Sequence, residues 1–277
     1  MKEITRAHKI AVIAGAGELP RLVIDTLKQG KSEFIVLALQ GHADQLATKE
    51  QNCYDVHIGK VGTILKLLKQ HKVKQIVFAG SVKRPSLLSL KLDATALLML
   101  AKMGISRLSG GDDTILSTII ALSTKEGFEV CSPESIVPSM LVQPGKLGKI
   151  APSASDNKDI AIGKKVLNKL GDMDVGQSAV VEDGCVLGIE AAEGTDQLIL
   201  RCGKLKREKT RLGIVIKMKK STQERRIDLP AIGTTTIQNL HDAGFKGIAL
   251  EANSSLIINK KAVISLADKL GVFVVGV

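Results

Sequence analysis

The sequence contains few aromatic residues and no closely spaced cysteines. Aromatic residues make up 2% of the 277 positions, with no Trp and one Tyr. Proteins that bind single-stranded nucleic acid stack bases on aromatic side chains, so this scarcity argues against nucleic acid as a partner. The four cysteines (Cys53, Cys131, Cys185 and Cys202) form no CxxC pair, and Cys131 and Cys185 fall in apolar runs. We therefore expect buried, reduced thiols rather than disulfides.

Signals for export and membrane insertion are also missing. No stretch of about 20 uncharged apolar residues could span a membrane, and the polar start MKEITRAHK precedes no apolar signal segment. We therefore expect a cytoplasmic protein. The net charge of +11 and the isoelectric point of about 9.5 predict an anionic partner: nucleic acid, an acidic membrane surface or a phosphorylated substrate. Because the basic residues are mostly spread out, a solvated basic surface explains the charge equally well.

Several common catalytic motifs are absent from the chain. GxxxxGK[ST], GxSxG and HExxH do not occur, and the five histidines are scattered. These absences exclude a P-loop enzyme and disfavour both a zinc site and a histidine-rich two-metal centre. Any phosphate chemistry must therefore depend on carboxylates, arginines and lysines.

The stretch IAVIAGAGELP (residues 10–20) is similar to the start of a dinucleotide-binding domain. Gly15 and Gly17 are spaced for a tight turn and a close approach of the backbone to phosphate. Pro20 replaces the third glycine, and the next strand, FIVLALQG, ends without an acidic residue for a ribose hydroxyl. An NAD(P)-linked enzyme is therefore disfavoured, whereas a phosphate-bearing ligand at a helix N-terminus stays open.

Strand and helix patterns alternate through the first half of the chain. Strands separated by helices predict an α/β domain with a Rossmann-like parallel sheet, and ligands bind beyond the carboxyl ends of such strands. The expected strands are 10–14, 34–39, 75–79 and 128–131, and the expected helices are 18–29, 61–71, 87–103 and 112–126. The strand ends expected to face a ligand are residues 15–17, 40–44 and 80–85.

The second half of the chain follows a different pattern. Residues 132–155 are rich in Pro, Gly and Ser and predict a linker, so we place an N-terminal domain at 1–145 and a C-terminal domain at 146–277. Asp183 and Gly184 lie between two apolar runs and predict a hairpin. A second, mixed α/β domain follows from further strands at 212–217, 247–251, 256–258 and the chain end, with helices at 234–242 and up to 270.

Three short segments carry charged residues suited to phosphate chemistry. SGGDDT (109–114) has two aspartates at a helix start, where capping also explains them. EAAEGTD (190–196) gathers acids at a strand end, where solvated turn acids are the alternative. In RRIDLP (225–230) two arginines beside Asp228 suit a phosphate clamp next to a metal ligand or base, and a surface salt bridge explains them equally well. Besides Asp228, the candidate residues for phosphate chemistry in these segments are Asp112, Asp113, Glu190, Glu193, Asp196, Arg225 and Arg226.

Seven motifs in order give a more specific indication than any one of them. They are IAVIAGAGELP, GSVKRPSL, GGDDTIL, DVGQSAVVEDGCVLGIEAAEGTD, RRIDLPAIG, GIALEA and LGVFVVGV. In this order they resemble the UDP-2,3-diacylglucosamine pyrophosphatases of the LpxI type, which act in lipid A biosynthesis. The resemblance extends from about Lys9 to Val277.

This resemblance implies two α/β domains with the substrate between them. It implies a Mg²⁺-dependent enzyme, peripherally associated with the anionic inner membrane, that releases UMP and 2,3-diacylglucosamine 1-phosphate. The family's essential aspartate matches Asp228, the expected catalytic residue and metal ligand, with Arg226 assisting. Substrate-binding residues are expected at Gly15, Gly17, Glu18, Lys83, Arg84, Gly111, Asp112, Gln177, Glu193, Thr195, Asp196 and Thr234.

Two alternatives remain at this point. A non-catalytic nucleotide- or membrane-binding module would use the basic surface itself. The apolar segment 86–104 could line a groove for acyl chains, or it could simply be a core helix. The sequence leaves the oligomeric state open, a homodimer included.

Overall fold

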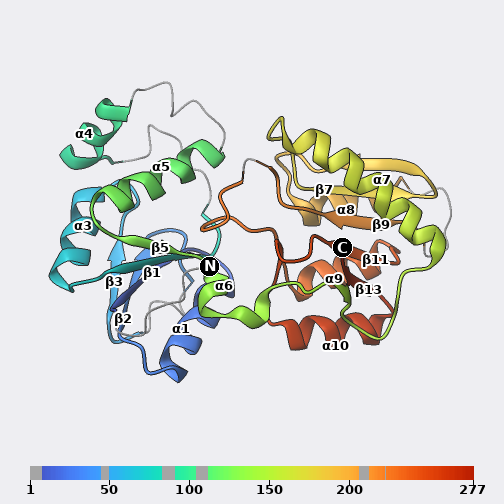
Figure 1. The fold of residues 1–277 in the computed structure, drawn as a ribbon, viewed down its shortest axis with the longest axis horizontal. Coiled ribbons are helices and arrows are strands. Elements are labelled where there is room, and N and C mark those ends of the chain that lie inside the picture. The colour runs from blue at the N-terminus through green and yellow to red at the C-terminus, as the bar shows by residue number, and fades with distance from the viewer. Residues whose placement is uncertain (1–7, 45–49, 83–90, 104–111, 206–211, 222) are drawn as a thin grey trace. The chain divides into compact units, whose positions relative to one another are not determined.

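The computed structural model describes residues 8–44, 50–82, 91–103, 112–205, 212–221 and 223–277 (Figure 1). The chain divides into two compact units, Met1–Pro138 and Ser139–Val277. Within the described ranges, no helix is long and apolar enough to cross a membrane. The two units are described separately below.

The N-terminal unit is built on a five-stranded parallel sheet in the order β3-β2-β1-β4-β5. Its central strands are continuous apolar runs, and such strands are stable only when both faces of the sheet are covered. Helix α3 covers one face by packing Leu68 against Ala11 and Ile13. The strands are β1 (Ile10–Ala14), β2 (Phe34–Leu39), β3 (Cys53–Val56), β4 (Gln75–Ala79) and β5 (Glu129–Cys131). The helices are α1 (Leu19–Gln29), α3 (Val61–Gln70), α4 (Ala94–Met103), α5 (Asp112–Lys125) and α6 (Pro133–Ile136).

The C-terminal unit is built on a six-stranded mixed sheet in the order β6-β13-β11-β9-β7-β8. Strand β11 pairs in parallel with β9 and β13, whereas β7 runs antiparallel to β8 and β9, and β6 runs antiparallel to β13. The strands are β6 (Gly145–Lys146), β7 (Ser178–Glu182), β8 (Cys185–Ile189), β9 (Ile214–Lys217), β11 (Gly247–Leu250) and β13 (Phe273–Gly276). A separate parallel pair consists of β10 (Ala231–Ile232) and β12 (Leu256–Ile257).

Helices cover both faces of this second sheet (Figure 1). One face, with Val215 and Ile248, packs against α8 (Thr195–Gly203), α9 (Thr234–Asp242) and α10 (Lys260–Leu270). The opposite face, with Ile214 and Ile216, packs against α7 (Ala154–Gly171). Neighbouring residues of β9 therefore enter different hydrophobic clusters, as the alternation of side chains along a strand requires.

The predicted fold class is confirmed, and most predicted elements lie within a few residues of their expected bounds. The missed elements are β3, α6, β6, α7, α8 and β10, together with the 3₁₀ turn at Pro138–Met140. Strand β3 reads CYDV and has no apolar run to mark it, and α7 begins inside the segment that we expected to be a linker. Helix α4 begins at Ala94 rather than residue 87, and residues 87–90 lie outside the described part. Cys131 and Cys185 lie in strands as expected, but both are half-buried rather than buried.

The expected linker, residues 132–155, contains regular structure. It holds α6, a 3₁₀ turn at Pro138–Met140 and strand β6. The backbone of Val142 donates a hydrogen bond of 3.0 Å to the Ser255 carbonyl, and β6 pairs with β13. These bonds attach residues 139–146 to the C-terminal unit, so the division lies after Pro138, earlier than the boundary that we expected at 145/146.

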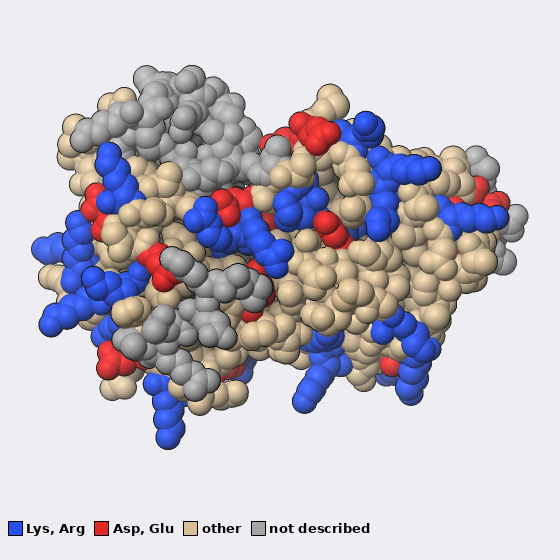
Figure 2. Space-filling model, viewed as in Figure 1, with Lys and Arg blue, Asp and Glu red and all other residues tan. Residues whose placement is uncertain are grey.

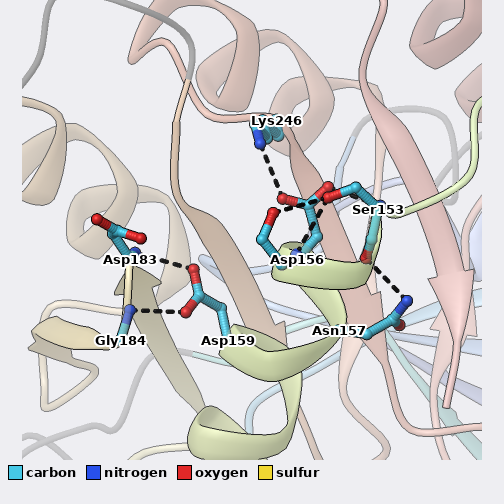
Figure 3. A network of polar contacts seen from close by, with 8 residues as sticks. Ser153, Asp156, Asn157, Asp159, Asp183, Gly184 and Lys246 are labelled. Carbon is cyan, nitrogen blue, oxygen red and sulfur yellow. Dashed lines mark hydrogen bonds and ion pairs between the residues drawn. The ribbon is translucent and has the colours of Figure 1, made fainter.

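A polar network joins the start of α7 to two other segments of its unit (Figure 3). Ser153 and Asp156 form a reciprocal capping box, and Lys246 donates to Asp156 at 2.9 Å. Burial alone would raise the pKa of Asp156, but hydrogen bonds from Ser153 and Lys246 outweigh it and hold the pKa below its usual value. One turn later, the Asp159 carboxylate accepts the backbone N–H groups of the hairpin residues Asp183 and Gly184, at 2.9 and 2.8 Å.

Helix α7 lies close against the sheet at Gly163. A Cβ atom at this position would lie 2.6 to 3.1 Å from three side-chain atoms of Ile216. We expect Gly163→Ala to lower the free energy of unfolding by about 1–3 kcal/mol, because overpacking outweighs the gain in helix propensity. Gly171→Ala is the matched control in the same helix, since its Cβ would make ordinary contacts of 3.4 Å or more. Urea denaturation should show no loss for Gly171→Ala, and equal stabilities of the two variants would contradict this account of the packing.

Candidate functional site

Polar residues gather at one edge of the C-terminal sheet. Lys217 ends β9, and its register partners are Ser178 at the start of β7 and Leu250 at the end of β11. Glu190 directly follows β8, and its backbone N–H donates to the Ser178 carbonyl at 2.8 Å. Thr195, the first residue of α8, reaches the same place from the helix side. The edge therefore combines strand ends with a helix N-terminus, an arrangement that often holds ligands in α/β proteins.

The hydroxyl group of Thr195 is the centre of this cluster. It accepts a hydrogen bond of 2.6 Å from Lys217 Nζ and donates one of 3.0 Å to Glu190 Oε2. Ser178 Oγ lies 3.1 Å from the same oxygen. A hydroxyl has one proton and two acceptor positions, so the Ser178 hydroxyl must be the donor in that pair. These three bonds use the full capacity of the Thr195 hydroxyl, so a hydrogen bond from Thr195 to a substrate must come from its backbone.

Lys217 is 4% exposed and is the only buried lysine or arginine among the described residues. Burial lowers the pKa of its ammonium group, while the carboxylates of Glu190, Asp196 and Asp228 act in the opposite direction. The hydrogen bond that the structure gives its Nζ goes to Thr195 rather than to a carboxylate. The ammonium group is thus held by a neutral hydroxyl in the field of three acids.

Two of these acids are fixed by neighbouring side chains. Thr236 Oγ1 in the first turn of α9 donates to Asp196 Oδ1 at 3.0 Å, which ties α8 to α9. Gln223 is buried and donates from Nε2 to Asp228 Oδ2 at 2.6 Å. Asp228 itself is half-buried. Among the residues that the structure describes, none donates to its Oδ1.

Two of the predicted site residues, Arg226 and Glu193, each form an ion pair with another residue at the surface. Arg226 donates from Nε and Nη2 to the two oxygens of Glu224 at 2.9 and 2.8 Å, which raises its pKa and lowers that of Glu224. Glu193 accepts from Arg201 at 2.8 Å, which lowers the pKa of Glu193. The salt-bridge alternative for RRIDLP therefore describes Arg226 in this structure.

The carboxylates at this edge are the oxygen ligands that Mg²⁺ prefers. Protein sites commonly hold Mg²⁺ with one or two carboxylates together with substrate phosphates and water. In the described ranges, no three His, Cys, Asp or Glu side chains are placed to hold a metal together. Asp228, with Oδ1 available, fits a site of the smaller kind that substrate phosphates complete.

The predicted glycine turn belongs to the N-terminal unit. Ala16 and Ser81 exchange two backbone hydrogen bonds of 2.9 Å, and a Cβ on Gly15 would lie 2.5 Å from the Ser81 carbonyl oxygen. Gly17 has a φ of 94° and donates its N–H to Asp44 Oδ2 at 2.8 Å. These contacts confirm that the ends of β1, β2 and β4 meet. The Gly17 N–H, however, already serves an internal carboxylate.

The remaining predicted residues fall into three groups. Gln177 and Thr234 lie in the C-terminal unit with Thr195, Asp196 and Asp228; Gln177 precedes β7, and Thr234 is the first residue of α9. Glu18 is exposed at the N-cap of α1. Lys83, Arg84 and Gly111 lie outside the described residues, as does the side chain of Asp112 at the start of α5.

Sequence analysis missed Ser178, Lys217 and Gln223. A signal existed for Lys217, since a lysine that ends the apolar run GIVIK is unusual for a buried strand. Ser178 and Gln223 carry no comparable signal, because their roles depend on pairing across the sheet and on a loop conformation.

The three hydrogen bonds of the Thr195 hydroxyl can be tested directly by substitution. Thr195→Val keeps the shape but leaves buried Lys217, Ser178 and Glu190 without their partner, so we expect a loss of about 2–4 kcal/mol in unfolding free energy. Thr195→Ser keeps the hydroxyl and should cost less than about 1 kcal/mol. Urea denaturation of both variants is the measurement. If Thr195→Val and Thr195→Ser lose similar amounts of unfolding free energy, the hydroxyl group is not what stabilises this cluster.

Comparisons with known proteins cover nearly the whole chain. Residues 9–140 match the LpxI N-terminal domain, and residues 143–275 match the LpxI C-terminal domain. The UDP-2,3-diacylglucosamine pyrophosphatase LpxI of Caulobacter vibrioides is 37% identical over 275 residues, which is 98% of each chain. A solved structure of N5-carboxyaminoimidazole synthase from Aspergillus clavatus covers 75% of this chain and 46% of its own, with 12% identity and a TM-score of 0.26, too low to support an argument. Both family domains and the near-complete coverage show that the chain belongs to the LpxI family.

Proposed function

We propose that this protein hydrolyses the pyrophosphate bond of UDP-2,3-diacylglucosamine to UMP and 2,3-diacylglucosamine 1-phosphate, a step of lipid A biosynthesis. One observation carries the proposal: the relative named for this pyrophosphatase activity is 37% identical over 98% of both chains. The cluster at the edge of the C-terminal sheet supports it, because carboxylates, a buried cation and a helix N-terminus suit phosphate chemistry.

In this reaction water attacks the phosphorus on the glucosamine side. The water oxygen bonds to that phosphorus, and the bond from the same phosphorus to the bridging oxygen breaks, so that UMP leaves with the bridging oxygen. We assign to Asp228 the task of orienting the water and taking its proton. Gln223 donates to Oδ2 of Asp228 at 2.6 Å, which fixes the carboxylate and leaves the task of binding the water to Oδ1.

The negative charge of the pyrophosphate must be offset during the reaction. We assign part of this task to the N-terminus of α9 at Thr234, where the first backbone N–H groups have no partner within the helix. When bound by Asp228 and phosphate oxygens, Mg²⁺ supplies further neutralisation at the phosphoryl group. Arg226 has a side chain that is 47% exposed, and it would bind a phosphate by exchanging it for Glu224.

Asp228 is the decisive residue of this proposal. Asp228→Ala should lower kcat by at least ~10²–10⁴-fold, the usual cost of losing a general base. It should still fold, because Glu190 and Asp196 remain to balance the charge of Lys217. Asp228→Asn should be nearly as inactive, since it keeps the shape and loses the charge. UMP release from UDP-2,3-diacylglucosamine, with Mg²⁺ and with excess EDTA, measures both the variants and the metal requirement.

The control is Asp242→Ala on the exposed side of α9, whose carboxylate accepts from Gln238 at 2.9 Å. It should keep the activity of the parent. If Asp228→Ala stays within a few-fold of the parent, the assignment of Asp228 is wrong. A parent protein that binds the substrate without releasing UMP would instead indicate a non-catalytic binding module.

The proposed substrate carries two acyl chains, so we also propose peripheral association with an anionic membrane. The net charge of +11 supports it, and Figure 2 shows Lys and Arg side chains scattered over the visible face among Asp and Glu. In α4, Leu97 and Leu98 are 54% and 62% exposed, which is more than a core helix would leave. These two side chains are candidates for contact with acyl chains.

Electrostatic attraction of this kind depends on salt and on lipid charge. Each well-placed Lys or Arg contributes about 1 kcal/mol near an anionic surface, and salt screens the attraction. In liposome flotation we expect binding to anionic vesicles that falls as the salt concentration rises, and little binding to neutral vesicles. Equal binding to both kinds of vesicle would contradict the electrostatic account.

A further inference from the structure

The buried ammonium group of Lys217 needs an explanation beyond packing. Removing a charge from water is costly, and a buried lysine is usually paired directly with a carboxylate. Lys217 instead bonds to the Thr195 hydroxyl at 2.6 Å, while three acids act on it from further away. The ammonium group is therefore influenced by all three acids without forming, among the described residues, an ion pair with one of them.

The three acids reach this point from separate segments. Glu190 follows β8, Asp196 lies in the first turn of α8, and Asp228 lies in the loop before β10. Their mutual repulsion would be strong without a cation, because like charges in a partly buried site are poorly screened. Asp228 is also the carboxylate that fits a divalent cation, so Lys217 and the metal both interact with its negative charge.

We propose that Lys217 is a positioning residue that acts as the internal counter-cation of Glu190, Asp196 and Asp228, so that the free protein binds divalent metal weakly. The metal then binds together with the pyrophosphate, whose oxygens add the negative charge that Lys217 offsets. Through Thr195, the same ammonium group also fixes the start of α8. The inference rests on the proposed function for the identity of the phosphate ligand, but its effect on metal binding is measured without turnover.

The test measures binding of Mn²⁺ to the free protein by electron paramagnetic resonance. Lys217→Met removes the charge and should tighten Mn²⁺ binding about tenfold, as expected for losing a nearby positive charge, while kcat falls. Lys217→Arg keeps the charge and should bind Mn²⁺ like the parent. Thr195→Val removes the hydrogen bond but not the charge, so it too should leave the Mn²⁺ affinity near that of the parent.

The matched control is Lys269→Met, an exposed lysine in the last turn of α10, next to the start of β13. It lowers the net charge by the same amount at the opposite edge of the sheet and should not change the Mn²⁺ affinity. If Lys217→Met does not fold, Lys217→Gln takes its place, because it also removes the charge and keeps a donor for the Thr195 hydroxyl. The parent itself should bind Mn²⁺ weakly alone and much more tightly with inorganic pyrophosphate.

Two results would overturn the inference: tight Mn²⁺ binding to the parent without pyrophosphate, or unchanged affinity in a folded Lys217→Met variant. Failure of the proposed function has a different signature. In that case the parent releases no UMP, while Lys217→Met still changes the Mn²⁺ affinity.

Discussion

The burial of one positive charge constrains much of the C-terminal unit. Lys217 can remain buried only if a hydrogen-bond acceptor and compensating negative charge are brought to it. Thr195 provides the acceptor, and Glu190, Asp196 and Asp228 provide the charge. Together they connect two strand ends, the start of α8 and the loop before β10. The hydrophobic clusters on the two faces of the sheet hold the strands together. The polar contacts of Lys217 hold the segments that follow the strand ends.

In the N-terminal unit, the glycine turn after β1 binds a carboxylate of the protein itself. Its first turn has the close backbone approach of a phosphate-binding turn, with Gly15 against the Ser81 carbonyl. The Gly17 N–H donates to the Asp44 carboxylate, an internal anion placed where a phosphate oxygen was expected. Phosphate binding at Gly17 therefore requires that Asp44 give up this bond. The glycine pattern alone is thus weak evidence for a nucleotide, as the absence of an acidic residue after the second strand already indicated.

The exposed arginines and the buried Lys217 differ in how firmly each is held by its partners. Pairs such as Arg226 with Glu224 and Arg201 with Glu193 are solvent-exposed, and such pairs add little to stability. Their side chains can exchange partners at a small cost in free energy. Lys217 cannot do so, because burial makes the loss of its partner expensive. Selectivity for a ligand at this edge should therefore depend on the buried charge more than on the arginines.

The sequence by itself determined the α/β class, the parallel first sheet, the hairpin at Asp183 and Gly184, and Asp228 as a candidate, because these depend on local periodicity, turn chemistry and motif order. It did not reveal α7, whose amphipathic pattern is weak because Gly163 packs directly on Ile216. It also could not show that Ser178, Glu190, Thr195 and Lys217 meet, since they lie on four segments that come together only when β7, β8 and β9 pair. Burial of a charge is a property of the packed fold, and only the tertiary structure could decide where it occurs.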